Sequence, residues 1–160
     1  MLVKEHTMRA IAYAGIVSCL IFTPVQSAEV SQTNDKPTEV TAKTDNKEAE
    51  AFSQAVKKQQ KNLPKKVNSY ITWTDITLEG KSVINIYLVN PDDLNVPLSV
   101  ALAELKTSGK ANIVKGLKDN DGLKAVLRHG YSLVYRYYGK DKQVLHEFTV
   151  ELKDLPPPNG

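Results

Sequence analysis

The stretch from Gly130 to Leu152 constrains the fold of this chain more than any other segment. Two runs rich in Val, Tyr, Leu and Phe flank a polar turn at residues 139–142, which is the pattern of an antiparallel β-hairpin. In the second run, residues of one parity are mostly apolar: Val144, His146, Phe148, Val150 and Leu152. Such alternation is typical of a strand that packs one face against a core and exposes the other.

Two further strands are predicted upstream of this hairpin. Residues 67–78 and 82–89 are rich in β-branched and aromatic side chains, and Glu79-Gly80-Lys81 between them is a turn sequence. The apolar residues of the first strand change face near Thr74-Asp75, which predicts a β-bulge there. In the second strand they occupy both faces, as in a strand that is covered on each side. These two strands form a second hairpin.

A helix is predicted before the first hairpin. Apolar residues recur at helical spacing from Asn46, a residue type that caps helices, and Pro64 ends the helix by restricting the residue before it. Five lysines gather near its end: Lys57, Lys58, Lys61, Lys65 and Lys66. They form either the solvated end of the helix or a contact for an acidic partner.

More helices are predicted between the hairpins. Pro97 opens a helix that Ser108-Gly109 interrupts and that resumes over residues 111–117. A last short helix has its cap within Asp119-Asn120 and its terminator at Gly130. The loop around Asp119 and Asn120 resembles a calcium-binding loop, but aligning its glycine puts residues unsuited to calcium at two ligand positions.

The order of elements predicts the fold class. Hairpins grouped around helices, without regular strand–helix alternation, favour an α+β domain. We expect an antiparallel sheet of about four strands, with the N-terminal helix and two to three central helices packed on one face. The domain is expected to cover residues 46–155. A disordered polar linker (28–45) precedes it and a flexible tail (156–160) follows.

The N-terminal residues predict export. Residues 1–27 contain a basic start, an apolar run over residues 10–22 and small residues for cleavage, the three parts of a secretory signal. Ile16 to Cys19 also resembles the lipobox of bacterial lipoproteins, in which Cys19 would carry the lipid. Because the apolar run continues past Cys19, cleavage after Ser27 and lipidation at Cys19 stay as alternatives. The protein is therefore expected to be periplasmic or secreted or, in the alternative, a membrane-anchored lipoprotein.

The sequence contains none of the familiar signatures of catalysis or of nucleic-acid binding. The net charge of +3 comes without a basic stripe, which argues against a nucleic-acid partner. There is no G-x-S-x-G nucleophile motif or glycine-rich phosphate loop. His129 and His146 are isolated and are expected to have structural roles, so neither a metal site nor a cofactor is predicted. Asp92-Asp93 lies in a predicted loop, and we expect a protein without enzymatic activity.

Aromatic residues of the predicted sheet are the remaining candidates for function. Tyr, Trp and Arg dominate binding hot spots, although tyrosines are also good strand formers. Tyr137 and Tyr138 are adjacent in a strand and must point to opposite faces, so one of them is a candidate for exposure. The candidate binding surface on the sheet comprises Trp73, Tyr87, Arg136 and Tyr138.

Two short motifs resemble those of a loose group of small exported bacterial proteins. They are residues 62–68 (NLPKKVN), in which a Leu-Pro step leads into a hairpin, and residues 130–138 (GYSLVYRYY), in which a helix-ending glycine leads into a tyrosine-rich strand. The resemblance implies an α+β fold and a location in the envelope, and the group has no assigned biochemical activity. Many members carry two cysteines where this chain has Leu117 and Leu155, so no disulfide is implied here.

Three functions are compatible with these observations. The first is a periplasmic module that binds or scaffolds another envelope protein through a sheet face or edge. The second is a lipid-anchored accessory factor, similar to a pilotin or a chaperone, of a secretion or conjugation apparatus. The third is a small enzyme of unknown reaction. The oligomeric state is not specified by the sequence.

Overall fold

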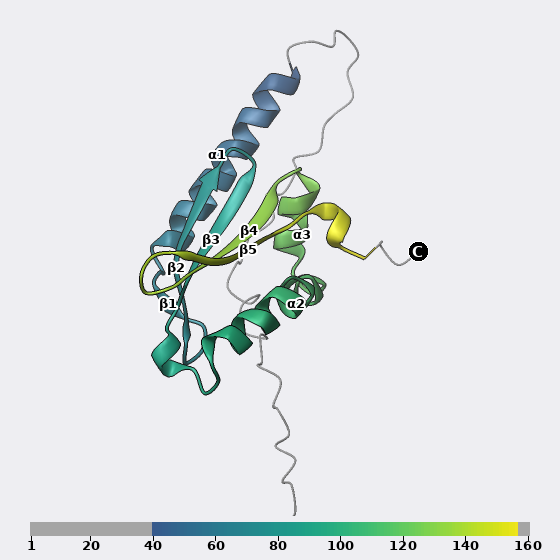
Figure 1. Cartoon of the computed structure of the whole chain (residues 1–160). Helices are drawn as coiled ribbons and strands as arrows, with labels where there is room; N and C mark the ends of the chain where they lie inside the picture. Colours follow the sequence, from purple (N-terminus) through teal and green to yellow (C-terminus); the bar gives the residue numbers. More distant parts are fainter. Residues whose placement is uncertain (1–39, 157–160) are drawn as a thin grey trace, which may run out of the picture.

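The computed structural model describes residues 40–156, with side chains from Ala49 onward. The predicted signal peptide, Cys19 and most of the predicted linker lie outside these residues, as does most of the predicted tail. The chain forms, in order, the following elements: α1 (Val40–Gln60), β1 (Lys65–Lys66), β2 (Ile71–Glu79), β3 (Ser82–Val89), η3 (Pro91–Asp93), α2 (Leu98–Leu117), α3 (Asp121–Arg128), β4 (Ser132–Tyr138), β5 (Val144–Val150) and η4 (Leu152–Asp154). Figure 1 shows this arrangement.

The strands form one mostly antiparallel sheet in the order β1-β2-β3-β4-β5, which confirms the predicted α+β class. Two details differ from the prediction. A fifth strand, the two-residue β1, pairs with β2, and the central pair β3–β4 is parallel. The parallel pair follows from the connection: α2 and α3 carry the chain from the end of β3 back to the start of β4, as a parallel crossover requires.

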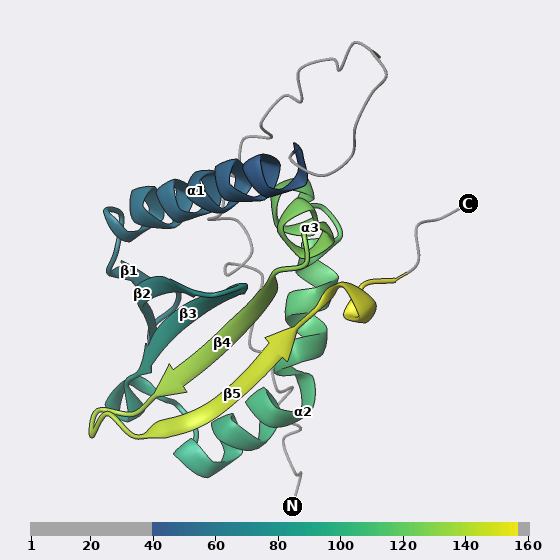
Figure 2. The same ribbon diagram turned by 90° about the horizontal axis from the view of Figure 1, so that it is seen from above.

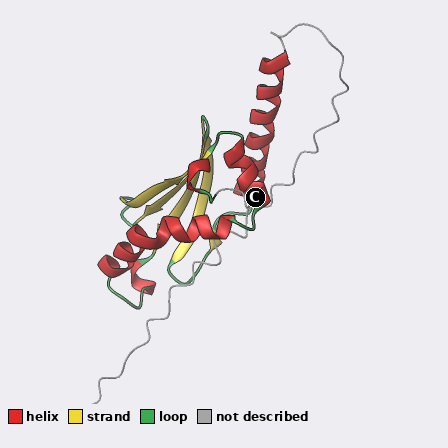
Figure 3. Cartoon of the chain, turned by 90° about the vertical axis from the view of Figure 1, so that its right-hand side faces the viewer, coloured by secondary structure: helices red, strands yellow, loops and turns green. Residues whose placement is uncertain are grey.

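The helices α1, α2 and α3 contribute to one hydrophobic core on one face of the sheet. Buried residues of the helices, including Val56 of α1, Ile113 of α2 and Val126 of α3, belong to the same cluster as strand residues such as Val83 and Leu133. Figure 2 shows α1 alongside β1 and β2, whereas α2 runs behind β5. Figure 3, seen from another side, shows a long helix lying across the sheet. The sheet is therefore covered by helices on one side.

The first helix and the first strand have different limits from those predicted. Helix α1 begins at Val40, before Asn46 and within the predicted linker. Strand β2 begins at Ile71 because the side-chain oxygen of Asn68 accepts hydrogen bonds from the backbone N–H groups of Tyr70 and Ile71 and turns the chain. The β-bulge predicted near Thr74-Asp75 is confirmed by the register shift between Trp73 and Asp75.

Helix α2 is continuous, so the predicted interruption at Ser108-Gly109 is wrong. Gly109 is buried, and a Cβ atom placed on it would lie 3.0 Å from Leu105 Cδ1 and 3.4 Å from Phe148 Cε1. The glycine thus allows the Phe148 ring of β5 to approach the helix closely. Ser108 stays within the helix by donating a hydrogen bond to the Glu104 carbonyl.

The predicted limits of α3 are confirmed. Asn120 is the N-cap, with its side-chain oxygen accepting from the Leu123 N–H at 3.0 Å. At the other end Gly130 has a φ of +77°, and the Gly130 and Tyr131 N–H groups donate to the Leu127 and Val126 carbonyls. This is the Schellman arrangement, which favours glycine.

Candidate functional site

Within residues 40–156, the helices pack on one face of the sheet only, and we call the other face the open face. It consists of the strand residues whose parity is opposite to that of the core residues. Its apolar members are Ile84, Ile86, Leu88, Val134, Tyr138 and Val144. None of them belongs to the hydrophobic core formed with the helices. At the centre of this face, Ile84 and Val134 pair side by side and are buried at 3% and 7% exposure.

Toward one end of the open face, the apolar side chains become exposed. Leu88 pairs with Tyr138, and Tyr138 pairs with Val144, so the three residues form one cross-strand row. Leu88 is 36% exposed, Val144 is 54% exposed and Tyr138 is half-buried. We call Leu88, Tyr138 and Val144 the apolar row. Large aliphatic and aromatic side chains that lie together at a surface mark interaction sites more often than scattered ones do.

Arg136 and Glu147 lie beside the apolar row on the open face. They pair directly across β4 and β5, and the Arg136 guanidinium donates a charge-assisted hydrogen bond from Nε to Glu147 Oε2. The bond with Glu147 is the main cause that raises the pKa of Arg136 above its ordinary value, and a second hydrogen bond, with Tyr138, adds to this effect. The hydrogen bond fixes the guanidinium on the surface of the sheet, with 29% of its side chain exposed.

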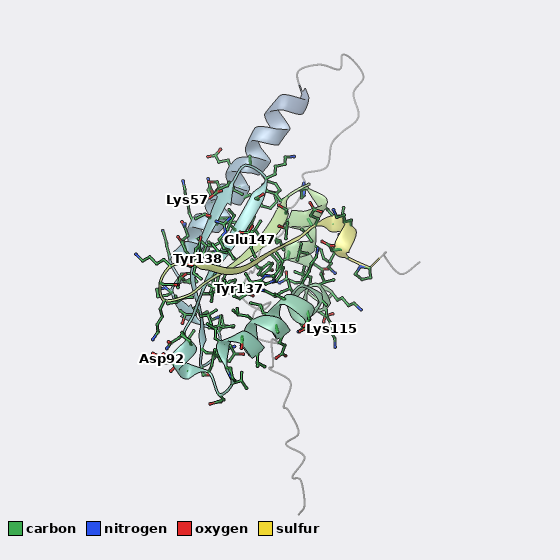
Figure 4. The ribbon with its side chains drawn as sticks, in the orientation of Figure 1. Lys57, Asp92, Lys115, Tyr137, Tyr138 and Glu147 are labelled. Carbon is green, nitrogen blue, oxygen red and sulfur yellow. The ribbon has the colours of Figure 1, made fainter. Side chains whose placement is uncertain are left out.

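The structure divides the four predicted surface residues between the two faces. Arg136 and Tyr138 lie on the open face, and Figure 4 shows Tyr138 near Glu147. Trp73 and Tyr87 lie on the helix-covered face at 3% and 2% exposure, so they are not part of this surface. Their parity places them with the core residues of the sheet.

Trp73 and Tyr87 belong to a stacked series of core rings. The Trp73 and Tyr87 ring centroids are 6.2 Å apart, Tyr87 and Tyr137 are 5.0 Å apart, and Tyr135 and Phe148 are 5.2 Å apart. The burial of Tyr135 raises the pKa of its hydroxyl strongly. Most of the sheet's aromatic residues therefore pack the core, which is the ordinary role of aromatic residues in strands.

Sequence reasoning missed Leu88 and Val144 as surface residues. Val144 shares sequence parity with Phe148 and Val150, which predicts that it faces the core. A register shift between Tyr137 and Tyr138 moves Val144 onto the open face, and Leu145 packs against the core instead. In the sequence, one sign of a second apolar surface was present: the strand of residues 82–89 has apolar side chains at both odd and even positions.

The outer edge of β2 is occupied at Ile76, next to the bulge. Gln60 of α1 donates to the Ile76 carbonyl at 2.7 Å, and Asp75 Oδ1 accepts from the Ile76 N–H at 2.8 Å. Together with the bulge and the lysine-bearing strand β1, these bonds blunt that edge, as proteins commonly do.

Three other features of the described residues bear on metal binding, ligand binding and membrane insertion. No cluster of three or more His, Cys, Asp or Glu side chains within residues 49–156 is placed to hold a metal ion. A shallow depression of about 270 Å³ lies between the end of α3 and η4, lined by Leu127, Tyr131 and Leu152 among others. Among the helices that the structure describes, none combines the length and the apolar character that crossing a bilayer requires.

Comparisons with known proteins relate the chain by structure alone. No family model and no curated protein matches its sequence. Three solved structures resemble it: a "putative secreted protein" of Pseudomonas aeruginosa (17% identity, TM-score 0.56), the type II secretion pilotin EpsS of Vibrio vulnificus (13%, 0.55) and the type II secretion pilotin AspS of Vibrio cholerae (14%, 0.52). The matches cover 73%, 72% and 72% of this chain and 97%, 98% and 99% of those chains. The chain therefore has the fold of these secreted and pilotin proteins.

Proposed function

We propose that this protein is an accessory factor of a bacterial secretion apparatus, with a role similar to that of a pilotin, and that it binds another envelope protein of that apparatus. The observation that carries the proposal is the fold, which matches two type II secretion pilotins over nearly their whole length. The predicted export signal agrees with a location in the cell envelope, where such a partner is found.

The open face supports a binding role in preference to catalysis. Its surface carries the Arg136–Glu147 pair and the apolar row, in which Leu88 and Val144 are exposed and Tyr138 is half-buried. These side chains suit contact with another protein. In this account the open face is the surface that contacts the envelope partner. A general scaffolding role in the periplasm, outside any secretion apparatus, is the second candidate.

The proposal is tested by recovering the partner from cells. The tagged full-length protein is expressed in its own bacterium, the envelope fraction is crosslinked, and proteins recovered with the tag are identified by mass spectrometry. We expect one stoichiometric component of a secretion apparatus. In a strain lacking this protein, the same component should be mislocalised or reduced in amount, and export of secreted proteins should fall. Recovery of a single partner unrelated to secretion, with normal export in the deletion strain, would favour the general scaffold.

Variants of the apolar row test whether the open face is the contact. Leu88→Asp combined with Tyr138→Ala should reduce recovery of the partner at least tenfold, because a charge replaces an exposed apolar contact. The matched control is Val100→Asp on α2, which changes a residue that is 47% exposed and lies outside the open face. Equal recovery with both proteins, each shown to be folded by circular dichroism, would exclude the open face as the contact.

Lipidation at Cys19 is part of the accessory-factor hypothesis and has its own test. Cells are labelled with a palmitate analogue, and Cys19→Ser serves as the control. Labelling of the native chain and not of the variant supports a lipid anchor. An unlabelled native chain shows that the factor acts without one.

A further inference from the structure

The apolar row continues across all five strands to a lysine. Lys66 of β1 pairs with Thr72, Thr72 pairs with Leu88, and Leu88 pairs with Tyr138. Val144 completes the row on β5. One line across the open face therefore runs from a basic side chain at the β1 edge, over a threonine, to the exposed apolar side chains of the apolar row.

Lys66 belongs to a basic corner of the molecule. The lysine corner consists of five exposed lysines in the last turn of α1, the following turn and β1: Lys57, Lys58, Lys61, Lys65 and Lys66. No acidic residue occurs in the sequence between Glu50 and Asp75. The corner thus holds five positive charges beside one partly buried carboxylate, that of Asp75, which accepts a hydrogen bond from Gln60 at the end of α1. The field of the corner's net positive charge extends about 8–10 Å into solvent at physiological salt.

The opposite end of the row has a different charge. The β4–β5 turn holds Lys140, which pairs with Asp92 of η3, and the turn also contains Asp141. Asp93 lies exposed next to Asp92 and accepts a hydrogen bond from Asn90. These two loops, which follow β3 and join β4 to β5, hold Lys140 and Lys142 against Asp92, Asp93 and Asp141, so the charge along the row changes from strongly positive at β1 to mixed, with one net negative charge, beside the apolar row.

We propose that the open face receives a segment of the partner protein in which apolar residues lie beside a cluster of acidic residues. The apolar residues would cover Leu88, Tyr138 and Val144, and the acidic cluster would lie over the lysine corner. The proposal rests on the proposed function, since it names the chemistry of the same partner. Opposite charges at such a rim direct the orientation and speed of association.

The mixed charge at the far end favours a protein segment over a membrane surface. An anionic bilayer lying flat on this face would attract the lysine corner, but it would also approach Asp92, Asp93 and Asp141. Like charges there would oppose the contact. A segment with acidic residues at one end only matches the observed change in charge along the row.

The spacing of the strands sets the expected spacing in the partner. Lys66 and Tyr138 lie three strands apart, a separation of about 14 Å at roughly 4.8 Å per strand. An extended chain covers that distance in about four residues, and a helix in about nine or ten. The acidic cluster should therefore lie about four to ten residues from the apolar contact.

Site-specific photo-crosslinking in the native bacterium tests this directly. A photoreactive amino acid is placed in the full chain at Lys66 and, in separate cells, at Tyr138. The control position is Lys115 on α2, which Figure 4 shows away from Tyr138. We expect both test positions to capture one protein, with an acidic segment joined to position 66 and an apolar segment joined to position 138, about four to ten residues apart. Lys115 should capture neither segment.

Three results overturn the proposal: capture only of lipid, capture of segments without acidic residues at position 66, and absence of any product at both positions in a protein shown to be folded. Capture of the expected pair of segments in a protein outside any secretion apparatus would uphold this inference and contradict the proposed function. A secretion component that is recovered with the tag but crosslinks elsewhere would do the reverse.

Charge reversal gives a second readout. Lys61→Glu combined with Lys66→Glu should weaken binding of the captured protein at least about tenfold and remove most of its salt dependence, because the steering charge is reversed. Lys115→Glu combined with Lys118→Glu changes the net charge equally at exposed positions of another surface and should leave binding within about twofold. Equal effects of the two double variants would show a general charge effect and contradict the lysine corner as the contact.

Discussion

His146 shows how one side chain on the helix-covered face responds to its surroundings. It lies on β5 opposite Tyr137, and its ring is 5.8 Å from that of Phe148. The pKa of His146 is lowered below the ordinary value of 6.5, mainly by partial burial and to a lesser extent by the positive charge of Lys106 on α2. Both causes disfavour the imidazolium, so this histidine is a packing residue that resists protonation in the folded protein.

The stability of the protein should therefore fall as His146 becomes protonated. The unfolded chain takes up this proton near pH 6.5, above the pH at which the folded protein does, so the free energy of unfolding decreases as the pH falls through this window. We expect His146→Gln to make urea unfolding less dependent on pH between about 7.5 and about 5.5. Ser99→Gln, at an exposed position of α2, is the control, and it should keep the dependence of the native protein. Parallel curves for native and His146→Gln proteins would contradict this assignment.

Single residues were predictable from the sequence where local chemistry decides their role. The helix cap, predicted at Asp119 or Asn120 and found at Asn120, and the terminator Gly130 depend only on neighbours in the chain, and both predictions are confirmed. The face on which a strand residue lies depends on register. One bulge near Tyr138 reverses the environment of Val144, and the amino-acid pattern alone does not place that bulge.

At the scale of elements, α2 and β5 depend on each other. A glycine inside a helix normally weakens it by about 1 kcal/mol relative to alanine, and for this reason the sequence predicted that the helix is interrupted at Gly109. In the structure the buried glycine lies against Leu105 and Phe148, so packing against β5 maintains the helix. Tertiary contact decided the length of this helix, and no local signal contains that information.

A larger side chain at Gly109 should force α2 and β5 apart. We expect Gly109→Leu to lower the free energy of unfolding by about 1–3 kcal/mol, the usual cost of overfilling a packed interface. Urea denaturation followed by circular dichroism measures the change. Ala111→Leu makes a comparable change at an exposed position of the same helix and should stay within about 0.5 kcal/mol of the native value. If both variants unfold at the same urea concentration, Gly109 is not a packing position.

For the whole molecule, the order of strands was the part that the sequence could not supply. Both hairpins were predictable because their turns and alternating residues are local. How the hairpins join depends on where α2 and α3 return the chain, and this connection makes β3 and β4 parallel neighbours at the centre of the sheet. The Ser82 and Ser132 hydroxyls, 50 positions apart in sequence, lie 3.0 Å from each other at the start of this pair.

Because three helices and the sheet share one core, the described part of the chain should unfold as a unit. Ile113 of α2 is 1% exposed in that core, which also contains the single tryptophan, Trp73 of β2, at 3% exposure. Ile113→Ala should lower the free energy of unfolding by about 2–5 kcal/mol. The variant should lower the urea midpoints of Trp73 fluorescence and of far-ultraviolet circular dichroism to the same value, since small single domains unfold cooperatively.

Val100→Ala, at an exposed position of α2, should leave both midpoints nearly unchanged. A fluorescence midpoint that stays in place while the dichroism midpoint falls would mean that α2 unfolds separately from the sheet, and the shared core would then not be a cooperative unit.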